Sequence, residues 1–546
     1  MPDEWNFADV FEAVAEGAPT AVAIIHGDKQ VMWRDFDRRA NALAADLLRS
    51  GVGRQGKVMT YLYNSAEYLE TYYGAIKAAM VPVNVNYRYG PTEVAYLCEN
   101  ADAEAVVFDT QFADLLAQVR DATPGIGVRR WLGVGPPADV PEWATPYEDA
   151  INGGADRPEV PWARSGDDLL MVYTGGTTGM PKGVMWAHDD LFRSMGHGGV
   201  PLLGIDAVER LDEFGPRAAH VAAAGNAPIV LQSCPLMHAT ALGNTFQMLP
   251  AGATIVLLEG SSFDAAHLWD AVAHHRVTWL TMVGDAFGRP LLAELDANPG
   301  RWDLQSLQVV YSSGVMWSKE VKQGLLRHLP ATVRLVDVLG STEAPGLGAS
   351  VSSGADPAAT AQFTIGAFAQ VISESGGFVE PGSGEVGLAA FGGFMPRGYY
   401  KDEAKTAATF RVVNGKRWSV PGDFATVDAD GTLKLLGRGS VCINTGGEKV
   451  FPEEVEEVLK LHPSVRDAVC VGVPDSRFGE LVVAVVEPAR LRGEVVAAEL
   501  ATFVKARLAG YKAPRHVVVV DTIGRAPSGK VDYARLRAHA RAELQR

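Results

Sequence analysis

Residues 173–183 read Tyr-Thr-Gly-Gly-Thr-Thr-Gly-Met-Pro-Lys-Gly, a run of glycine and threonine that leads into a lysine. Three threonines and three glycines fill positions 174–179. Glycine lets backbone N–H groups approach an anion closely, and the threonine hydroxyls add hydrogen-bond donors. The run is not a Walker A loop, because Pro181 precedes Lys182 and no Ser or Thr follows the lysine. Because an apolar, strand-like segment at 169–172 precedes it, we predict a triphosphate-binding loop rather than a flexible surface loop.

This loop resembles the phosphate-binding loop of the adenylate-forming superfamily, which includes acyl-CoA synthetases, peptide-synthetase adenylation domains and luciferases. The resemblance covers about residues 36–530, and the later motifs follow in the order and spacing of that superfamily. It implies that the loop binds the phosphates of ATP. The residues expected to do so are Thr174, Gly175, Gly176, Thr177, Thr178, Gly179 and Lys182.

Length and composition limit the alternatives. A chain of 546 residues is too long for one hydrophobic core, so two or more domains are expected. The formal net charge of −16 argues against a nucleic-acid partner held by a basic face. The four cysteines lie far apart and form no CxxC pair, which fits a reducing compartment and offers no zinc site. No signal peptide and no transmembrane segment is visible. We expect a cytoplasmic location and leave peripheral membrane contact open.

The hydrophobic pattern predicts an α/β fold. Helical patterns at 39–50 and 67–80 alternate with strand patterns at 57–62 and 81–85. Such alternation is typical of parallel sheets covered by helices. Further strands are expected at 105–108, 254–258, 279–283, 309–312 and 333–338, and further helices at 266–274 and 319–327.

The last hundred or so residues are expected to form a separate small α/β unit. A helix at 452–460 has proline at its start and acidic residues in its first turn, which the helix dipole favours. Strands at 465–473 and 481–487 follow, and then a helix at 494–508. The resemblance implies a large N-terminal domain at 1–437 and a mobile C-terminal lid at 438–546, with the hinge near Ser440.

A second motif follows the first by more than 150 residues. Residues 336–343 read Val-Asp-Val-Leu-Gly-Ser-Thr-Glu, a strand that runs into a turn with a carboxylate. This resembles the Gly-x-Thr-Glu motif, which implies that Thr342 contacts the α-phosphate and that Glu343 helps to hold Mg²⁺. A hard cation prefers carboxylate and phosphate oxygens as ligands. The alternative is that Ser-Thr-Glu only caps a helix.

Further residues match the nucleotide site of the superfamily. Residues 421–423, Pro-Gly-Asp, correspond to Thr-Gly-Asp, and Asp423 is expected to accept hydrogen bonds from both ribose hydroxyls. The alternative is a turn that needs no ligand. Arg438 matches an arginine that contacts ribose or phosphate. The resemblance also implies that Ser313 and Gly314 lie on the adenine side of the nucleotide site.

Two motifs fall in the C-terminal unit. Gly446 and Gly447 resemble the segment that lines the tunnel for the pantetheine arm of CoA; a plain Gly-Gly turn is the alternative. Residues 525–530, Arg-Ala-Pro-Ser-Gly-Lys, resemble the C-terminal lysine motif. Lys530 on a mobile lid would stabilise the charge that builds up as a carboxylate attacks the α-phosphate. A solvated surface lysine is the alternative.

The acyl site is expected around four residues. Met237 and His238 lie where the superfamily places an aromatic residue or a histidine near the acyl tunnel, although His238 as an ordinary core histidine fits nearly as well. Val315 belongs to an apolar segment expected to form the tunnel wall. Gly284 is also expected at this site, and it lies in the run Met-Val-Gly-Asp-Ala at 282–286, one of the stretches that carry a narrower resemblance. The chain also resembles actinobacterial fatty-acid and steroid side-chain CoA ligases.

The predicted function is an ATP- and Mg²⁺-dependent acid–CoA ligase, which makes an acyl-adenylate and then an acyl-CoA thioester. The expected substrate is a steroid side-chain or medium-to-long-chain fatty carboxylate, with ATP and CoA as the other partners and a homodimer left open. The alternatives are another adenylate-forming activity, luciferase-like or carrier-loading, and a non-catalytic nucleotide-binding sensor.

Overall fold

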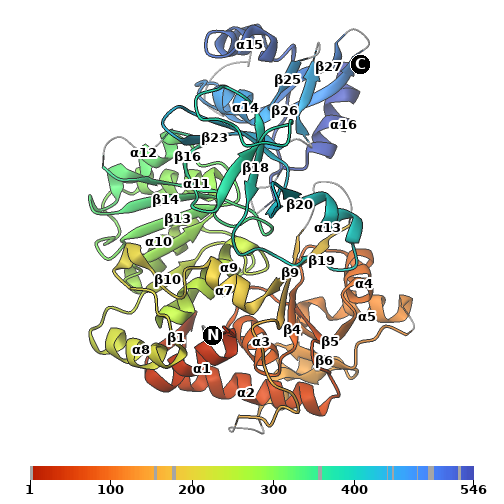
Figure 1. The fold of residues 1–546 in the computed structure, drawn as a ribbon, viewed down its shortest axis with the longest axis vertical. Coiled ribbons are helices and arrows are strands. Elements are labelled where there is room, and N and C mark those ends of the chain that lie inside the picture. Colours follow the sequence, from red (N-terminus) through yellow and green to blue (C-terminus); the bar gives the residue numbers. More distant parts are fainter. Residues whose placement is uncertain are drawn as a thin grey trace.

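The computed structural model describes residues 4–123, 125–152, 157–174, 180–354, 359–438, 441–445, 448–475, 478–489, 497–526 and 531–545. Figure 1 shows a large N-terminal part built on two sheets and a smaller C-terminal unit stacked on one end of it. The expectation of an α/β fold with a large N-terminal domain and a smaller C-terminal one is confirmed.

The first sheet has fifteen strands among the described residues. Its middle part, from β1 to β14, is parallel, whereas the strands after β14 pair in antiparallel fashion. In spatial order the strands are β2 (Lys29–Met32), β1 (Val22–His26), β11 (Thr254–Leu257), β10 (Ile229–Gln232), β12 (Trp279–Met282), β13 (Val309–Ser313), β14 (Arg334–Leu339), β15 (Gly348–Ser352), β16 (Gln362–Ile365), β23 (Thr432–Arg438), β22 (Asp423–Val427), β18 (Gly387–Phe391), β21 (Lys416–Ser419) and β20 (Phe410–Val413), with β17 (Ala369–Ile372) paired to β18.

The second sheet has eight strands in the described part of the chain, and it carries the ends of the glycine-threonine loop. Its strands run in the order β19 (Gly398–Tyr399), β9 (Lys182–Ala187), β8 (Leu169–Thr174), β4 (Val81–Asn84), β3 (Lys57–Tyr61), β5 (Ala103–Asp109), β6 (Arg130–Val134) and β7 (Thr145–Pro146). The strands β8 and β9 are antiparallel neighbours, and Thr174 lies opposite Lys182. The two strands that flank residues 175–179 are therefore paired with each other.

Helices pack against both sheets (Figure 1). In the N-terminal part they are α1 (Phe7–Gly17), α2 (Trp33–Arg49), α3 (Ala66–Lys77), α4 (Pro91–Asn100), α5 (Ala113–Ala122), α6 (Tyr147–Ile151), α7 (His188–Ser194), α8 (Phe214–Ala223), α9 (Ala239–Met248), α10 (Ala265–His274), α11 (Gly284–Ala297), α12 (Lys319–His328) and α13 (Glu403–Thr409). No helix in the described part of the chain is long and apolar enough to cross a membrane.

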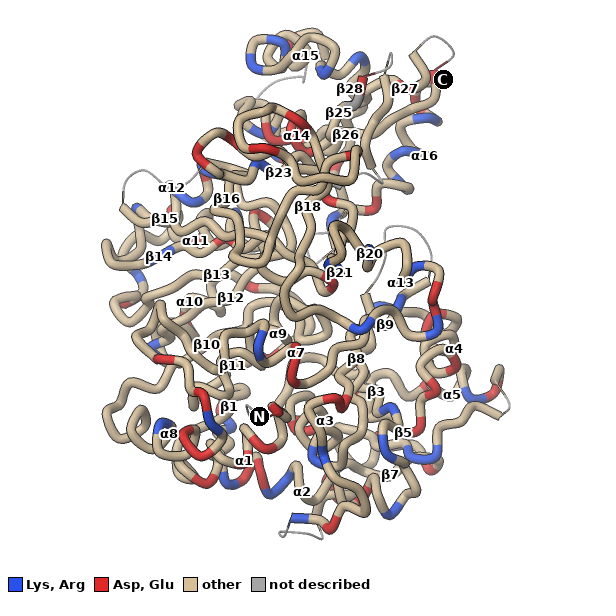
Figure 2. Tube along the Cα trace, in the orientation of Figure 1, with Lys and Arg blue, Asp and Glu red and all other residues tan. Residues whose placement is uncertain are grey.

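The C-terminal unit has its own sheet and its own core. The strands are β25 (Glu448–Val450), β24 (Ile443–Thr445), β27 (Gly479–Pro488) and β26 (Val465–Asp475), with β28 (His516–Val519) beside β27. The helices are α14 (Pro452–Lys460), α15 (Ala497–Lys505) and α16 (Tyr533–Leu544). Its apolar side chains form two clusters separate from the core of the N-terminal part. In the tube of Figure 2, basic and acidic residues are interspersed along the elements of both parts.

Most expected elements are present, and two differences have a physical cause. The helix α2 begins at Trp33, not at residue 39, because Trp33 and Phe36 are fully buried and continue its apolar face. The antiparallel strands between β15 and β22 were not predicted. They are short, and several begin or end at glycine or serine, so neither period 2 nor period 3.6 stands out in this region.

Candidate functional site

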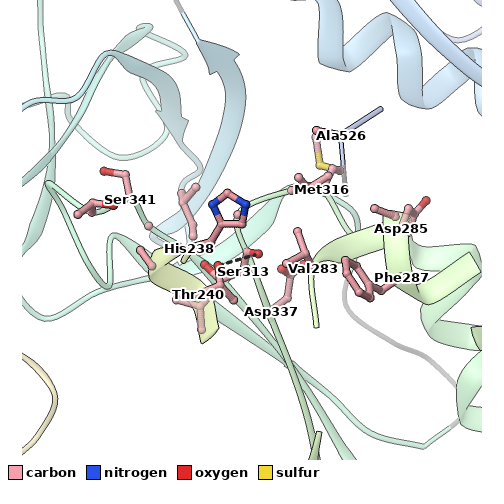
Figure 3. Close-up of a pocket in the computed structure, with 18 of the residues that line it drawn as sticks. His238, Thr240, Val283, Asp285, Phe287, Ser313, Met316, Asp337, Ser341 and Ala526 are labelled. Atoms are coloured by element: carbon pink, nitrogen blue, oxygen red, sulfur yellow. Dashed lines mark hydrogen bonds between the residues drawn. The ribbon is translucent and has the colours of Figure 1, made fainter. Parts of the chain in front are cut away.

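A cavity of about 2920 Å³ lies between the N-terminal sheets and the C-terminal unit. Its walls include segments that follow the carboxyl ends of β10, β12, β13 and β14. In open α/β sheets ligands bind at such strand ends. Figure 3 shows part of the cavity, with His238, Ser313, Asp337 and Ser341 from the N-terminal part and Ala526 from the C-terminal unit around it.

Both ends of the glycine-threonine loop reach this cavity. Thr174 and Lys182 line it, whereas residues 175–179, with Gly175, Gly176, Thr177, Thr178 and Gly179, lie outside the described residues. The Lys182 amino group forms an ion pair with Asp402. The hydrogen bond from Lys182 is the main reason why the pKa of Asp402 lies below its ordinary value. Lys182, partly exposed at the described end of the loop, is thus engaged by a carboxylate.

The Thr342–Glu343 turn is held from two sides. The indole Nε1 of Trp186 donates to the backbone oxygen of Thr342 at 3.0 Å. The Tyr399 hydroxyl donates to Oε1 of Glu343 at 2.8 Å. Both Thr342 and Glu343 line the cavity. The described residues 344–352 turn and enter β15 without a helix, so the alternative that Ser-Thr-Glu caps a helix is wrong.

The floor of the cavity comes from β13 and β14. Ser313, Gly314 and Val315 line it, and Gly314 has a φ of +95°, which favours glycine. Asp337 on β14 also lines the cavity, and its carboxylate accepts a hydrogen bond from the buried amino group of Lys322 at 2.8 Å. Burial raises the pKa of Asp337 above its ordinary value, although Lys322 opposes the shift.

The segment with Met237 and His238 is tied to the second sheet. The Asn84 side-chain amide donates to the backbone oxygens of Tyr173 at 2.9 Å and Met237 at 2.7 Å. Met237 is buried, His238 is half-buried, and both line the cavity. Asn84 therefore fixes the segment with Met237 and His238 relative to β8, the strand that leads into the glycine-threonine loop. It was missed from the sequence, although an asparagine at the end of a buried strand was visible there.

Gly284 is not part of the cavity wall but supports it. A Cβ at this position would lie 2.4 Å from the backbone oxygen of Met316 and 2.5 Å from that of Val315. Its backbone N–H donates to Oγ of Ser312 at 2.8 Å. Only glycine allows the start of α11 to pack so closely against the segment with Val315.

Asp423 and Arg438 are neighbours on paired strands. Asp423 opens β22, is 7% exposed and lines the cavity. The register of the β22–β23 pair puts it opposite Arg438, the last residue of β23. The backbone of Arg438 is described, but its side chain lies outside the described atoms.

The C-terminal unit contributes one side of the cavity. Arg525, Ala526 and Val531 line it, and Figure 3 draws Ala526 together with cavity residues of the N-terminal part. The Arg525 guanidinium holds Asp467 through two hydrogen bonds of 2.6 and 2.9 Å. Ser440, Gly446, Gly447 and Lys530 lie outside the described residues. The segments on either side of Lys530 are therefore brought to the same cavity as Thr342 and Glu343.

A large domain and a smaller one thus lie on either side of one cavity, an arrangement typical of two-domain enzymes. The model of the AMP-binding enzyme family matches residues 11–400, and that of the AMP-binding enzyme C-terminal domain matches residues 454–530. The chain belongs to the AMP-binding enzyme family.

Full-length relatives agree with this assignment. A medium/long-chain-fatty-acid–CoA/3-oxocholest-4-en-26-oate–CoA ligase of Mycobacterium marinum is 41% identical over 97% of this chain and 95% of its own. A 3-oxocholest-4-en-26-oate–CoA ligase of Rhodococcus rhodochrous is 39% identical over 97% of this chain and 94% of its own.

Solved structures share the fold. The anthranilate CoA ligase AuaEII in complex with anthranoyl-AMP has a TM-score of 0.84 at 21% identity and covers 100% of this chain and 99% of its own. ATP-bound MatB from Rhodopseudomonas palustris has a TM-score of 0.80 at 23% identity and covers 98% of this chain and 99% of its own. At these identities the likeness concerns the fold alone.

Proposed function

We propose that this protein is an AMP-forming acid–CoA ligase for bulky apolar carboxylates. The observation that carries the proposal is the convergence of three sequence motifs on one cavity. Thr174 and Lys182 flank the glycine-threonine loop, Thr342 and Glu343 form the second motif, and the flanks of the lysine motif close the cavity from the C-terminal unit. Relatives about 40% identical over nearly the full length carry names of fatty-acid and steroid-acid CoA ligases, which supports the same reading.

The proposed reaction has two steps. A carboxylate oxygen of the acid attacks the α-phosphorus of ATP, the bond to the β-phosphate oxygen breaks, and pyrophosphate leaves. The CoA thiol, after loss of its proton, then attacks the acyl carbonyl, and AMP leaves with the electron pair of the broken C–O bond. Activation is needed because a free carboxylate is a poor electrophile, and no covalent protein nucleophile is required.

Each binding role is assigned to particular residues. The glycine-threonine loop and Lys182 take the β- and γ-phosphates, Thr342 takes the α-phosphate, and Asp423 with Arg438 takes the ribose. Ser313 and Gly314 face the adenine. Gly446 and Gly447 form the path of the pantetheine arm, and Lys530 neutralises the charge at the α-phosphate during the first step.

Glu343 has the chemistry expected of a magnesium ligand. No group of three or more His, Cys, Asp or Glu that could hold a metal by itself occurs among the residues that the structure describes. A single carboxylate fits, because Mg²⁺ usually takes one or two carboxylates and completes its shell with phosphate oxygens and water. Tyr399 fixes the orientation of this carboxylate. When bound, the cation would neutralise charge on the phosphates.

The domain boundary is proposed at 437/438, and the C-terminal unit is proposed to rotate between the two steps. Lys530 serves the first step and must give way to the pantetheine arm in the second. Gly437 has a φ of +123°, a conformation that favours glycine at the junction. The cytoplasm remains the proposed compartment, supported by the cysteine pattern, and a homodimer remains open.

The proposal is tested by acid-dependent exchange of labelled pyrophosphate into ATP, followed by a thioester assay. The panel contains acetate, benzoate, palmitate and a C24 steroid acid, each with and without CoA. We expect exchange without CoA for palmitate and the steroid acid, and thioester with CoA. A clear preference for acetate would overturn the substrate class. ATP binding without exchange for any acid would favour a nucleotide sensor.

A further inference from the structure

The helix α9 forms one wall of the cavity and carries a glycine in the middle of that wall. Gly243 lines the cavity, and so do Thr240 and Gln247, which lie one turn before and one turn after it. Residues three and four apart on a helix share a face. These three residues are half-buried, whereas most of the rest of α9 is buried, so the face that holds Gly243 is the one turned towards the cavity.

Neither the backbone nor the packing explains a glycine at this position. The left-handed glycines of the described residues do not include Gly243. Glycine inside a helix is also less stable than alanine. A Cβ at Gly243 would meet, as its nearest atom, Cε of Met195 at 3.8 Å, which is an ordinary contact. The helix could hold a side chain here, and it holds none.

Two other helix glycines show the contrast. A Cβ at Gly288 on α11 would lie 2.8 Å from Val321, and one at Gly324 on α12 would lie 2.2 Å from Leu292. Those glycines let α11 and α12 pack closely. Gly243 instead leaves space on the cavity side of its helix.

The wall of the cavity opposite Gly243 is apolar, and it includes a side chain that adapts its shape. Met195 follows α7 directly, is half-buried and lines the cavity together with Leu191. Methionine adapts its shape easily because its side chain is unbranched. The space between α7 and α9 is thus bounded by Gly243, which has no side chain, and by Met195, whose side chain adapts its shape.

We propose that Gly243 sets the width of the acyl passage between α7 and α9, and that it admits acids with a wide, ring-bearing chain. This inference rests on the proposed function. A side chain at position 243 narrows the passage towards Met195. A straight alkyl chain is narrower than a fused ring system and still passes, so the substitution acts on selectivity rather than on the chemical step.

The test compares Gly243→Ala and Gly243→Leu with the wild type. For each protein, kcat/KM of acyl-adenylate formation is measured with octanoate, palmitate and a C24 steroid acid. In Gly243→Leu we expect kcat/KM for the steroid acid to fall by at least about tenfold, because a steric block in an acyl pocket acts on the transition state of the excluded substrate. The kcat/KM for octanoate should stay within about twofold of the wild-type value. Gly243→Ala should also raise the melting temperature by about 1–2 °C, because alanine favours the helix.

A second substitution separates the passage from a general disturbance of α9. Met195→Ala in the Gly243→Leu background removes the atom that the new side chain approaches. It should restore a large part of the steroid activity while leaving octanoate unchanged. If the double variant is folded and the steroid activity is not restored, the proposal that Gly243 sets the width of the passage is wrong.

The outcomes also separate this inference from the proposed function. Equal losses for octanoate and the steroid acid in Gly243→Leu, or no loss for either, would overturn the role of Gly243 alone, provided that the wild type activates both acids. A wild type that activates octanoate and palmitate but not the steroid acid would overturn the inference alone. A wild type that activates none of the three acids would overturn the proposed substrate class and the inference with it.

Discussion

Lys182 and Asp402 form an ion pair at the edge of the cavity, although 220 residues separate them in the sequence. Lys182 opens β9, and Asp402 caps α13 by accepting a hydrogen bond from the backbone N–H of Lys405 at 2.9 Å. The two side chains are 36% and 27% exposed. Partly solvated ion pairs of this kind contribute little stability. In the proposed ATP complex, Lys182 exchanges this carboxylate for a phosphate oxygen.

Asp402→Asn should therefore strengthen ATP binding. Asparagine keeps the helix cap and removes the charge that competes for Lys182. We expect the Kd for ATP to fall about two- to fivefold, the range that corresponds to one exposed ion pair. Isothermal titration with ATP and Mg²⁺ measures it. Asp264→Asn, at the cap of α10, is the matched control and should change nothing. Weaker ATP binding in Asp402→Asn would contradict the proposal that Lys182 leaves Asp402 to bind a phosphate oxygen.

Asp423→Ala should weaken ATP binding by about 10- to 100-fold, because a charged acceptor for the ribose hydroxyls is lost. The melting temperature without ATP should hardly change if Asp423 serves the ligand. Asp430→Ala, in the turn at the other end of the β22–β23 hairpin, is the control. A large drop in melting temperature with normal ATP affinity would support a purely structural turn instead.

A buried charge cluster makes the anchoring of α1 depend on pH. Glu12 accepts hydrogen bonds from Lys77 at 2.7 Å and from Arg164 at 2.9 and 2.8 Å. Burial alone would raise the pKa of Glu12, but the hydrogen bond from Arg164 and the charge of Lys77 outweigh it and hold this pKa below the ordinary 4.5. A lowered pKa stabilises the fold above pH 4.5, and this contribution is lost as the pH falls through the lowered value.

Glu12→Gln removes this contribution. At pH 7 the variant should have a lower free energy of unfolding than the wild type, and the difference should shrink as the pH drops below about 4.5. Urea unfolding at a series of pH values between 7 and 3.5 measures the difference. A gap between the two proteins that stays constant over this range would show that the ionisation of Glu12 does not stabilise the fold.

The regular elements could be predicted where one apolar period dominates. The helix α14 has the predicted bounds, and β3 and β11 differ from the predicted strands by one residue at the carboxyl end. The site residues that follow a strand in a recognisable motif, such as Thr342 and Glu343, were also found, because their neighbours in sequence are part of the pattern.

Contacts between distant segments could not be predicted in this way. Trp186 reaches Thr342 across 156 residues, and Tyr399 reaches Glu343 across 56. Nothing near Trp186 or Tyr399 in sequence indicates a polar partner, since both look like core aromatics. Gly284 is a related case: its motif was recognised, but only the backbone of Val315 and Met316 against it reveals a supporting role.

Lys530→Ala should separate the two proposed half-reactions. The charge of Lys530 is needed while negative charge develops at the α-phosphate and not in the thiol step, so adenylation should fall by about 10²–10³-fold or more. Synthetic acyl-adenylate and CoA should still give thioester at a substantial fraction of the normal rate. Lys505→Ala, an exposed lysine on α15, is the control. Equal loss of both half-reactions, or of neither, would remove Lys530 from this role.

In the proposed mechanism, the carboxylate of the acid attacks the α-phosphorus of ATP. The most direct measurement follows oxygen. The protein is incubated with ATP, Mg²⁺, CoA and palmitate or a C24 steroid acid whose carboxylate carries ¹⁸O, and the products are analysed by mass spectrometry. We expect one ¹⁸O atom in AMP for each thioester formed, because the attacking oxygen stays on the α-phosphate when the thiol displaces AMP. Thioester formation with unlabelled AMP, or with ADP and ¹⁸O-labelled inorganic phosphate, would contradict it.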